Sequence, residues 1–261
     1  IRQKKWQKER HLLKKLYVDT GNYFGNKLLT INTLIDNKEE IGIEELVFPE
    51  KLVVVGDDVV GFSMPLIENS FNLSDILQGY NYSNAEKIER LKQVGQILKK
   101  IRNVKKLKGK FFMGDVHENN FIIDEKTGKL LAVDLDSCKI GNNQPFPMRY
   151  LAVNKQVLSL RKKYQINREG FHKPSKDTDI LCYIFMILNS ISNGPVHNLH
   201  IEEYYLYMQH LVDKGVSKEL VDCFSRIYMP GENISPDYLI DELSEYSGEL
   251  NYNVFKHKLG R

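Results

Sequence analysis

The sequence predicts an α+β fold, with a small antiparallel sheet near the N-terminus and a larger, mainly helical C-terminal part. Two β-rich runs at 51–55 and 58–67 are separated by a Gly-Asp pair, which favours a tight reversal between antiparallel strands. Apolar residues recur at three- and four-residue steps over about 83–104, and the pattern is again helical from residue 177 onward. Between these helices, two short apolar runs joined by a turn predict a second hairpin.

The first 36 residues contain one expected strand and one expected helix. A basic stretch over 1–15 leads into a short apolar piece, where we expect a strand that ends near Val18. Leucine and isoleucine recur over 27–36 at spacings that fit one face of a short helix. The β-branched residues in this stretch leave a strand as the alternative.

A boundary between two parts of the chain is predicted just after the second β-run. Pro65 has no N–H to donate to a sheet, so the strand should leave the sheet there. Asn72 or Ser74 can then cap a helix. We predict a small lobe over 1–68 and a larger helical lobe over 69–261. The helices expected in the larger lobe span about 83–104, 177–191, 201–213, 217–228 and 236–245.

The composition argues against several classes of protein. Charged residues make up 27% of the 261 residues but leave a net charge of only +3, which is typical of an ordinary globular chain. The longest apolar stretch, at 180–188, is too short to cross a membrane. Three widely separated cysteines show no zinc-ligand spacing. We therefore expect a cytoplasmic protein without nucleic-acid or membrane partners. Because the chain begins with Ile1, we expect a fragment or a processed form.

Polar residues crowd both ends of the second hairpin. Asp115 and Asn120 lie in the loop before it, and Asp134 follows its last apolar run. One carboxylate can orient a hydroxyl group, while the amide and the other carboxylate bind a hard divalent ion through oxygen. Mg²⁺ suits such sparse ligation because it keeps waters and takes phosphate oxygens as further ligands. Phosphoryl transfer needs little more than such positioning and charge neutralisation.

The segments GDVHENN and VDLDS resemble the catalytic loop and metal-binding segment of the protein-kinase-like superfamily, in the GDxHxxN form of bacterial-type Ser/Thr kinases and small-molecule phosphotransferases. The resemblance implies that Asp115 is the catalytic aspartate and that Asn120 and Asp134 bind Mg²⁺. Leu135 and Asp136 depart from the family's Phe-Gly. His117 stands where many protein kinases carry a lysine, and we hypothesise that it contacts the transferring phosphate.

Two further segments carry the same resemblance. The stretch from Val47 to Leu77, which contains GFSMPLIENSFNLSDIL, is similar to the strand, hinge and helix with which one bacterial kinase-like group binds adenine. The resemblance places the hinge at Met64, Leu66 and Glu68. The segment PSKDTDILCYIFMIL is similar to the start of a long central helix, in which a buried aspartate, here Asp179, holds the backbone of the catalytic loop.

The N-terminal segment matches the family less well. Lys15 is the best match to the lysine that holds the ATP phosphates, but no glycine precedes it. Either the Gly-rich loop is absent from this chain, or Gly21 and Gly25 form a substitute. The glutamate partner of the lysine stays open among three residues, Glu39, Glu40 and Glu44.

The resemblance implies an enzyme that uses ATP and Mg²⁺ to transfer the γ-phosphoryl group to a hydroxyl acceptor. The first hypothesis is a Ser/Thr protein kinase with a protein substrate. The second is a small-molecule kinase of the aminoglycoside or choline type. The third is a pseudokinase that binds nucleotide or a partner as an interaction module. The missing Gly-rich loop favours the third, whereas the complete set Asp115, Asn120 and Asp134 opposes it.

Overall fold

The computed structural model describes residues 4–6, 11–15, 22–79, 81–104, 107, 111–141, 176–226, 234–246 and 250–258. Its architecture is mixed α+β, which confirms the predicted fold class. The helices are α1 (Asn22–Ile41), α2 (Leu73–Leu77), α3 (Asn84–Arg102), α5 (Lys176–Ile191), α6 (Ile201–Asp213), α7 (Lys218–Arg226), α8 (Pro236–Glu245) and α9 (Tyr252–Lys258). The strands are β1 (Lys4–Trp6), β2 (His11–Lys15), β3 (Lys51–Val55), β4 (Asp58–Pro65), β5 (Ser70–Asn72), β6 (Phe111–Phe112), β7 (Phe121–Asp124), β8 (Leu130–Ala132) and β9 (Lys139–Ile140).

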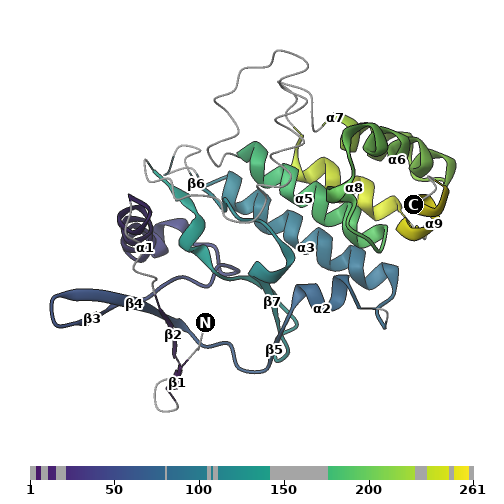
Figure 1. The fold of residues 1–261 in the computed structure, drawn as a ribbon. Helices are drawn as coiled ribbons and strands as arrows, with labels where there is room; N and C mark the ends of the chain where they lie inside the picture. Colours follow the sequence, from purple (N-terminus) through teal and green to yellow (C-terminus); the bar gives the residue numbers. More distant parts are fainter. Residues whose placement is uncertain are drawn as a thin grey trace.

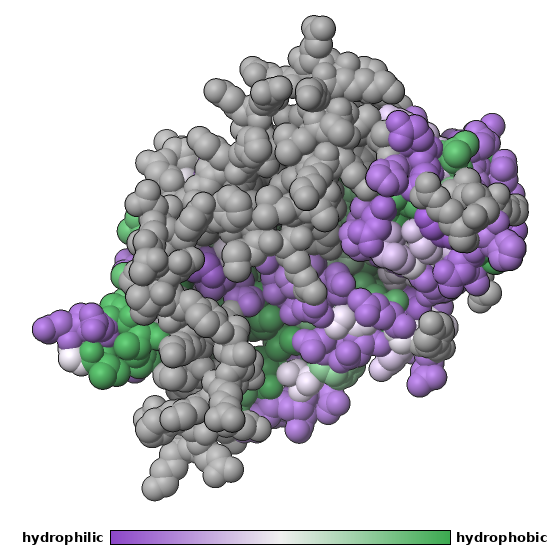
Figure 2. All heavy atoms as spheres, viewed as in Figure 1, coloured by the Kyte–Doolittle hydropathy of each residue, from purple (hydrophilic) through white to green (hydrophobic). Residues whose placement is uncertain are grey.

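The N-terminal sheet has the strand order β1-β2-β4-β3, and every neighbouring pair is antiparallel. The predicted hairpin is confirmed: β3 and β4 are joined at Gly56, whose φ of 62° lies in the left-handed region that glycine adopts without strain. Strand β4 ends at Pro65, as expected. Strand β2 ends at Lys15, and the predicted continuation to Val18 lies outside the described residues. Figure 2 shows hydrophobic residues gathered on this hairpin, where Val54 and Val55 are more than half exposed.

Helix α1 packs against the sheet and confirms the helix expected at 27–36, although it is much longer. Its residues Ile31 and Leu34 are fully buried, and it ends at Gly42, which has a φ of 59°. Gly25 lies inside α1. The alternative in which Gly21 and Gly25 form a phosphate loop is therefore wrong for Gly25, and Gly21 lies outside the described residues.

The larger hydrophobic core is centred on α3, which packs against α5 and α8. Ser83 caps α3 by accepting a hydrogen bond from the Glu86 amide. At Gly95, an added Cβ would lie 2.6 Å from the hydroxyl of Tyr183, so this glycine permits close helix packing. The expected helices are confirmed, apart from residues 227–228, which lie outside the described part. Helix α9 was not expected.

Two small β units connect the sheet with the helices (Figure 1). Strands β5, β7 and β8 form one, with the order β5-β7-β8, and β6 pairs with β9 in the other. Residues 45–47, which follow α1, bond to β8: the Ala132 amide donates to the Glu45 carbonyl at 2.7 Å, and Val47 donates to the Ala132 carbonyl at 2.9 Å. The segment after α1 is thereby fixed to the strand that leads into Asp134.

The hydrophobic interior contains two clusters. The smaller consists of Ile31 from α1, Phe62 and Met64 from β4, and Val47 from the segment after α1. The larger contains apolar residues of the C-terminal helices, together with residues of α1 and of the small β units. In the described part of the chain, no helix is long and apolar enough to cross a membrane. All three cysteines are buried free thiols.

Candidate active site

The loop at 113–117 is held by one buried carboxylate. Asp179, near the start of α5, accepts hydrogen bonds from the backbone amides of Met113 at 2.7 Å and Gly114 at 2.8 Å. Gly114 has a φ of 78°, so a glycine is suited to this turn. Burial raises the pKa of Asp179 to about 7, although the two amide bonds favour the charged form. The predicted contact between Asp179 and the loop backbone is confirmed.

Asp115 and Asn120 contact each other within this loop. The Asn120 side-chain amide donates to the Asp115 backbone carbonyl at 2.8 Å and lies 3.4 Å from the Asp115 Oδ2. Because its nitrogen is used in this way, the Asn120 side chain has its Oδ1 left to bind a cation. The other carboxylate oxygen of Asp115, Oδ1, is buried and accepts no hydrogen bond from the described residues.

His117 is buried beside the same carboxylate. Its Nδ1 accepts a hydrogen bond from the Asn119 amide at 3.2 Å, and its Nε2 lies 3.4 Å from Asp115 Oδ2. An accepting Nδ1 places the proton of the neutral ring on Nε2, where it faces Asp115. His117 can therefore orient Asp115, and its predicted contact with a phosphate stays a prediction.

Asp134 lies at the end of β8 in an unusual backbone conformation. Its φ of 62° and ψ of 45° are left-handed, a conformation that aspartate tolerates better than most residues. The preceding Val133 amide donates to the Asn120 carbonyl at 2.8 Å. The loop that carries Asp115 and the turn that carries Asp134 are thus joined directly.

Four carboxylates contribute to the electrostatic environment of the buried Cys138 thiol. Burial raises the pKa of this thiol well above its usual range, and the negative charges of Asp179, Asp136, Asp134 and Asp115 raise it further. These aspartates span 65 positions of the sequence, from 115 to 179. The fold therefore brings the predicted residues into one acidic locus.

An ion pair between Lys27 and Asp136 was not predicted. Lys27, in the second turn of α1, lies 3.0 Å from a carboxylate oxygen of Asp136. The Asp136 side chain is 9% exposed and that of Lys27 is 29% exposed. One signal was present in the sequence: Lys27 lies four and seven residues before Ile31 and Leu34, on the buried face of α1.

The three candidate glutamates for the lysine–glutamate pair lie at and just after the end of α1. Glu39 and Glu40 are exposed near the end of α1, and Glu44 lies 3.4 Å from Lys129 in an exposed pair. The predicted phosphate ligand Lys15 lies in β2 opposite Gly61, and its side chain lies outside the described residues.

The predicted hinge follows β4. Met64 is buried in the smaller core cluster, Leu66 is half-buried, and Glu68 is exposed. This placement leaves the backbone at 66–68 in the connection between the sheet and α2.

A scan against models of known protein families finds no match to this chain, and a search of curated proteins finds no similar sequence. What the site does has to be inferred from its own side chains.

The candidate ligands Asp134 and Asn120 suit Mg²⁺ better than they suit a metal ion whose ligands all come from protein side chains. In the described ranges, no group of three or more His, Cys, Asp or Glu side chains is arranged to hold a metal ion. Mg²⁺ is usually held by one or two carboxylates together with phosphate oxygens and waters. Asp134 and the Asn120 Oδ1 would supply such a set.

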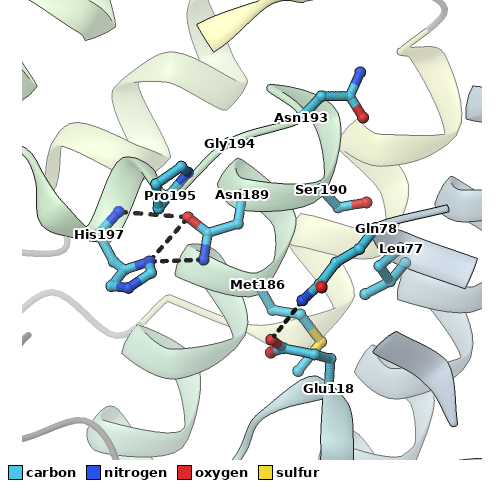
Figure 3. Close-up of a pocket in the computed structure, with 10 residues that line it drawn as sticks. All are labelled: Leu77, Gln78, Glu118, Met186, Asn189, Ser190, Asn193, Gly194, Pro195 and His197. Carbon is cyan, nitrogen blue, oxygen red and sulfur yellow. Dashed lines mark hydrogen bonds between the residues drawn. The ribbon is translucent and has the colours of Figure 1, made fainter. Parts of the chain in front are cut away.

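A cavity of ≈ 430 Å³ adjoins the loop (Figure 3). Glu118, Asn189, Ser190 and His197 supply its polar lining, and Leu77 and Met186 contribute apolar side chains. The Ser190 hydroxyl is buried without a hydrogen-bond partner among the described residues. Burial lowers the pKa of His197, while the charge of Glu118 acts in the opposite direction.

Sequence analysis missed this cavity because its lining comes from three distant segments. In Figure 3, His197 is bonded to Asn189, and Gln78 donates to Glu118 at 3.2 Å. The half-buried ring of His197 contributes to the lining.

Proposed function

We propose that this chain is an ATP- and Mg²⁺-dependent phosphotransferase with a two-lobed, protein-kinase-like fold, acting in the cytoplasm on serine or threonine hydroxyls of a protein. The observation that carries the proposal is the Asp115 carboxylate. One of its oxygens lies near Asn120 and His117, and the other is buried without a donor among the described residues. A buried acceptor without a partner is costly, and a substrate hydroxyl would supply the missing donor.

Asp115 is assigned the role of general base. Its Oδ1 accepts the proton of the acceptor hydroxyl, as a carboxylate within hydrogen-bond reach of the hydroxyl can do. His117 is a positioning residue, because its Nε2 lies 3.4 Å from the other carboxylate oxygen. Asp179 keeps the backbone before Asp115 in place through its two amide bonds.

Asn120 and Asp134 would hold the Mg²⁺, which when bound neutralises charge on the transferring phosphoryl group. Lys27 is assigned a positioning role, since its ion pair with Asp136 connects α1 to the turn that follows Asp134. The backbone at Met64, Leu66 and Glu68 is proposed to bind adenine. Lys15 is proposed to contact the nucleotide phosphates.

The proposal is tested by measuring transfer of labelled γ-phosphate from ATP to generic protein substrates with Mg²⁺. We expect Asp115→Asn and Asp134→Asn each to lower the rate by at least about 100-fold, the lower end of what a general base or an electrostatic ligand contributes. The matched control is Asp58→Asn, on an exposed residue of β4, which should leave the rate unchanged. Undiminished transfer by either site variant contradicts the assignment.

Nucleotide binding is measured separately from transfer. Binding to the native state raises the unfolding temperature in proportion to RT ln(1 + [L]/Kd), so we expect ATP to stabilise the chain more with Mg²⁺ than without it. A stabilised chain that transfers no phosphate to any acceptor is the result expected of an interaction module. A chain that ATP does not stabilise contradicts the phosphotransferase proposal.

A small-molecule kinase is the second candidate, and the cavity in Figure 3 favours it. Its volume of ≈ 430 Å³ is suited to a small ligand. Glu118 supplies a negative charge, and Asn189 and Ser190 supply groups that bond hydroxyls or amines. A panel of aminoglycosides, sugars and amino alcohols tested beside protein substrates separates the two. The second candidate predicts that the unmodified chain transfers phosphate to a panel member and not to the protein substrates. Glu118→Gln should then weaken this transfer, which would assign the cavity to the small molecule.

A further inference from the structure

A buried lysine lies outside the proposed active site. Lys87, in the first turns of α3, is 4% exposed, and its ammonium group donates to the Asn193 Oδ1 at 3.0 Å. Among the residues that the structure describes, no carboxylate lies within ion-pair distance of it. Burial lowers the pKa of Lys87. A buried ammonium group is usually paired with a negative charge, and here a neutral amide takes that place.

Lys87 lines a polar cavity of ≈ 510 Å³ between the start of α3 and the segment before α9. Asn193 and Asn251 line it from two other segments, and no acidic residue belongs to its described lining. The nearest acid along the chain is Glu86. Its carboxylate is 2.8 Å from both the amide and the hydroxyl of Ser83, where it completes the cap of α3.

Asn193 and Asn251 each have a side-chain NH₂ group to offer a ligand. The Asn193 Oδ1 accepts from Lys87, and the Asn251 Oδ1 accepts from the Asn253 amide at 2.9 Å and the Val254 amide at 3.3 Å. Each side-chain oxygen is thus used within the protein, and each NH₂ group remains. The cavity therefore combines one ammonium group with amide donors, beside the positive end of the α3 dipole.

We propose that this cavity binds the phosphate group of a ligand larger than the phosphate ion. Phosphate suits these donors because it offers several acceptor oxygens. It also supplies a negative charge to pair with the Lys87 ammonium group. The cavity has room for more than the ion. Asn193 also lines the cavity in Figure 3, but no residue given a role in phosphoryl transfer lines this one, so the inference stands or fails independently of the proposed protein-kinase activity.

The first test compares variants of the full chain. Binding of inorganic phosphate is measured by the shift in unfolding temperature against sodium chloride at equal ionic strength. We expect Lys87→Met to weaken phosphate binding at least tenfold. Lys214→Met, which removes an exposed lysine that follows α6, should leave that binding unchanged. Equal phosphate binding by Lys87→Met and the unmodified chain overturns the proposal, and so does a chain that phosphate does not stabilise.

A second variant separates binding from the structural role of Lys87. Asn193 has a φ of 49°, a conformation that glycine adopts without strain. Asn193→Gly removes the acceptor of Lys87 and keeps the turn, but it also removes one of the proposed amide donors. The variant should therefore still bind phosphate, with a smaller loss than in Lys87→Met. A loss as large as that of Lys87→Met would mean that the lysine serves only the turn, and it contradicts the proposal.

A readout on the unmodified chain covers the case in which Lys87→Met does not fold. Labelling with an amine-reactive reagent, followed by mass spectrometry, reports each lysine separately. Phosphate should slow labelling of Lys87 and leave the exposed Lys126 and Lys214 unaffected. Unchanged labelling of Lys87 in saturating phosphate overturns the assignment.

The source of the phosphate group is identified by comparing a phosphoserine peptide and ribose 5-phosphate with inorganic phosphate. Tighter binding of the peptide supports a phosphorylated protein as the ligand, and tighter binding of the sugar phosphate supports a small metabolite. If neither binds more tightly than the ion, a larger ligand is contradicted.

Discussion

The loop that carries Asp115 and the helix that carries Lys27 both reach the turn at 134–137, but they are held there in different ways. The loop is fixed by Asp179, which is buried, and by the bond between Val133 and the Asn120 carbonyl. Helix α1 contacts the turn through Lys27 in its second turn, and the side chain of this lysine is 29% exposed. Buried hydrogen bonds fix one conformation, whereas a partly exposed ion pair is weaker and easier to open. We therefore expect the loop that carries Asp115 to be held more firmly than the contact between Lys27 and Asp136.

The largest expected effect is loss of the loop anchor. Asp179→Ala leaves the amides of Met113 and Gly114 buried without an acceptor. Each unsatisfied group costs about 1–3 kcal/mol, so we expect the free energy of unfolding to fall by about 2–6 kcal/mol. Urea denaturation measures this change. Asp241→Ala, at an exposed position of α8, is the control and should change stability by less than about 0.5 kcal/mol. A similar small change in Asp179→Ala would show that the loop is held by other contacts.

The pH dependence of stability tests the same anchor with a smaller effect. Burial raises the pKa of Asp179 to about 7 in the folded protein, whereas an aspartate in an unfolded chain titrates at about 3.9. Between these values the folded state binds more protons than the unfolded chain, so this residue makes stability fall as pH rises, by at most about 1.4 kcal/mol per pH unit. Its contribution is fully present at low pH and is lost as pH rises through 7.

Asp179→Asn removes this titration while keeping most of the side chain's shape. Its amide retains one acceptor oxygen for the two backbone donors, so the variant should be less stable than the unmodified chain at acidic pH. The difference in denaturation midpoint between the variant and the unmodified chain should narrow as the pH rises from 4 to 7. A difference that stays constant over this range would exclude a raised pKa at Asp179.

Breaking the α1 contact should have a third, smaller effect. Lys27→Met leaves the mostly buried Asp136 carboxylate without this lysine, which we expect to lower the free energy of unfolding by about 1–2 kcal/mol. If α1 positions the turn at 134–137, which is proposed to contribute the Mg²⁺ ligand Asp134, the KM for ATP should rise more than kcat falls. Lys27→Arg should restore both. An unchanged KM in Lys27→Met would remove Lys27 from the proposed site.

The smallest effect is expected at an exposed pair with the same chemistry. Lys129 and Glu44 lie 3.4 Å apart, with side chains that are 60% and 84% exposed. Lys129→Met should change the free energy of unfolding by less than about 1 kcal/mol, because water and salt screen such pairs. If Lys129→Met lowered the free energy of unfolding more than Lys27→Met does, burial would not explain how much each ion pair contributes to stability.

Local signals were enough to predict most of the fold. The hairpin at 51–65 followed from Gly56-Asp57 and Pro65, and α3 followed from its apolar periodicity and from Ser83 at its start. Helix α9 was missed because seven residues are too few for a clear period. Asn251, which bonds the amides of its first turn, was the available signal.

The candidate site was predicted only where its residues are neighbours in the sequence. Asp115 and Asn120 share one loop, and Asp134 follows the same hairpin. Lys27 and Asp136 are 109 positions apart, and no local pattern indicates that two such residues meet. The cavity beside Glu118 was missed for the same reason, since only tertiary packing brings residues 186–197 to the loop.

The burial of all three thiols gives the chain its own reporter of local opening. Cys138 follows the turn at 134–137 directly, and a thiol that is fully covered and kept protonated reacts with maleimides only when its surroundings separate. Its rate of alkylation therefore measures how often that turn opens. Any compound that closes the turn should slow the reaction, so a screen for ligands can start before an acceptor is known.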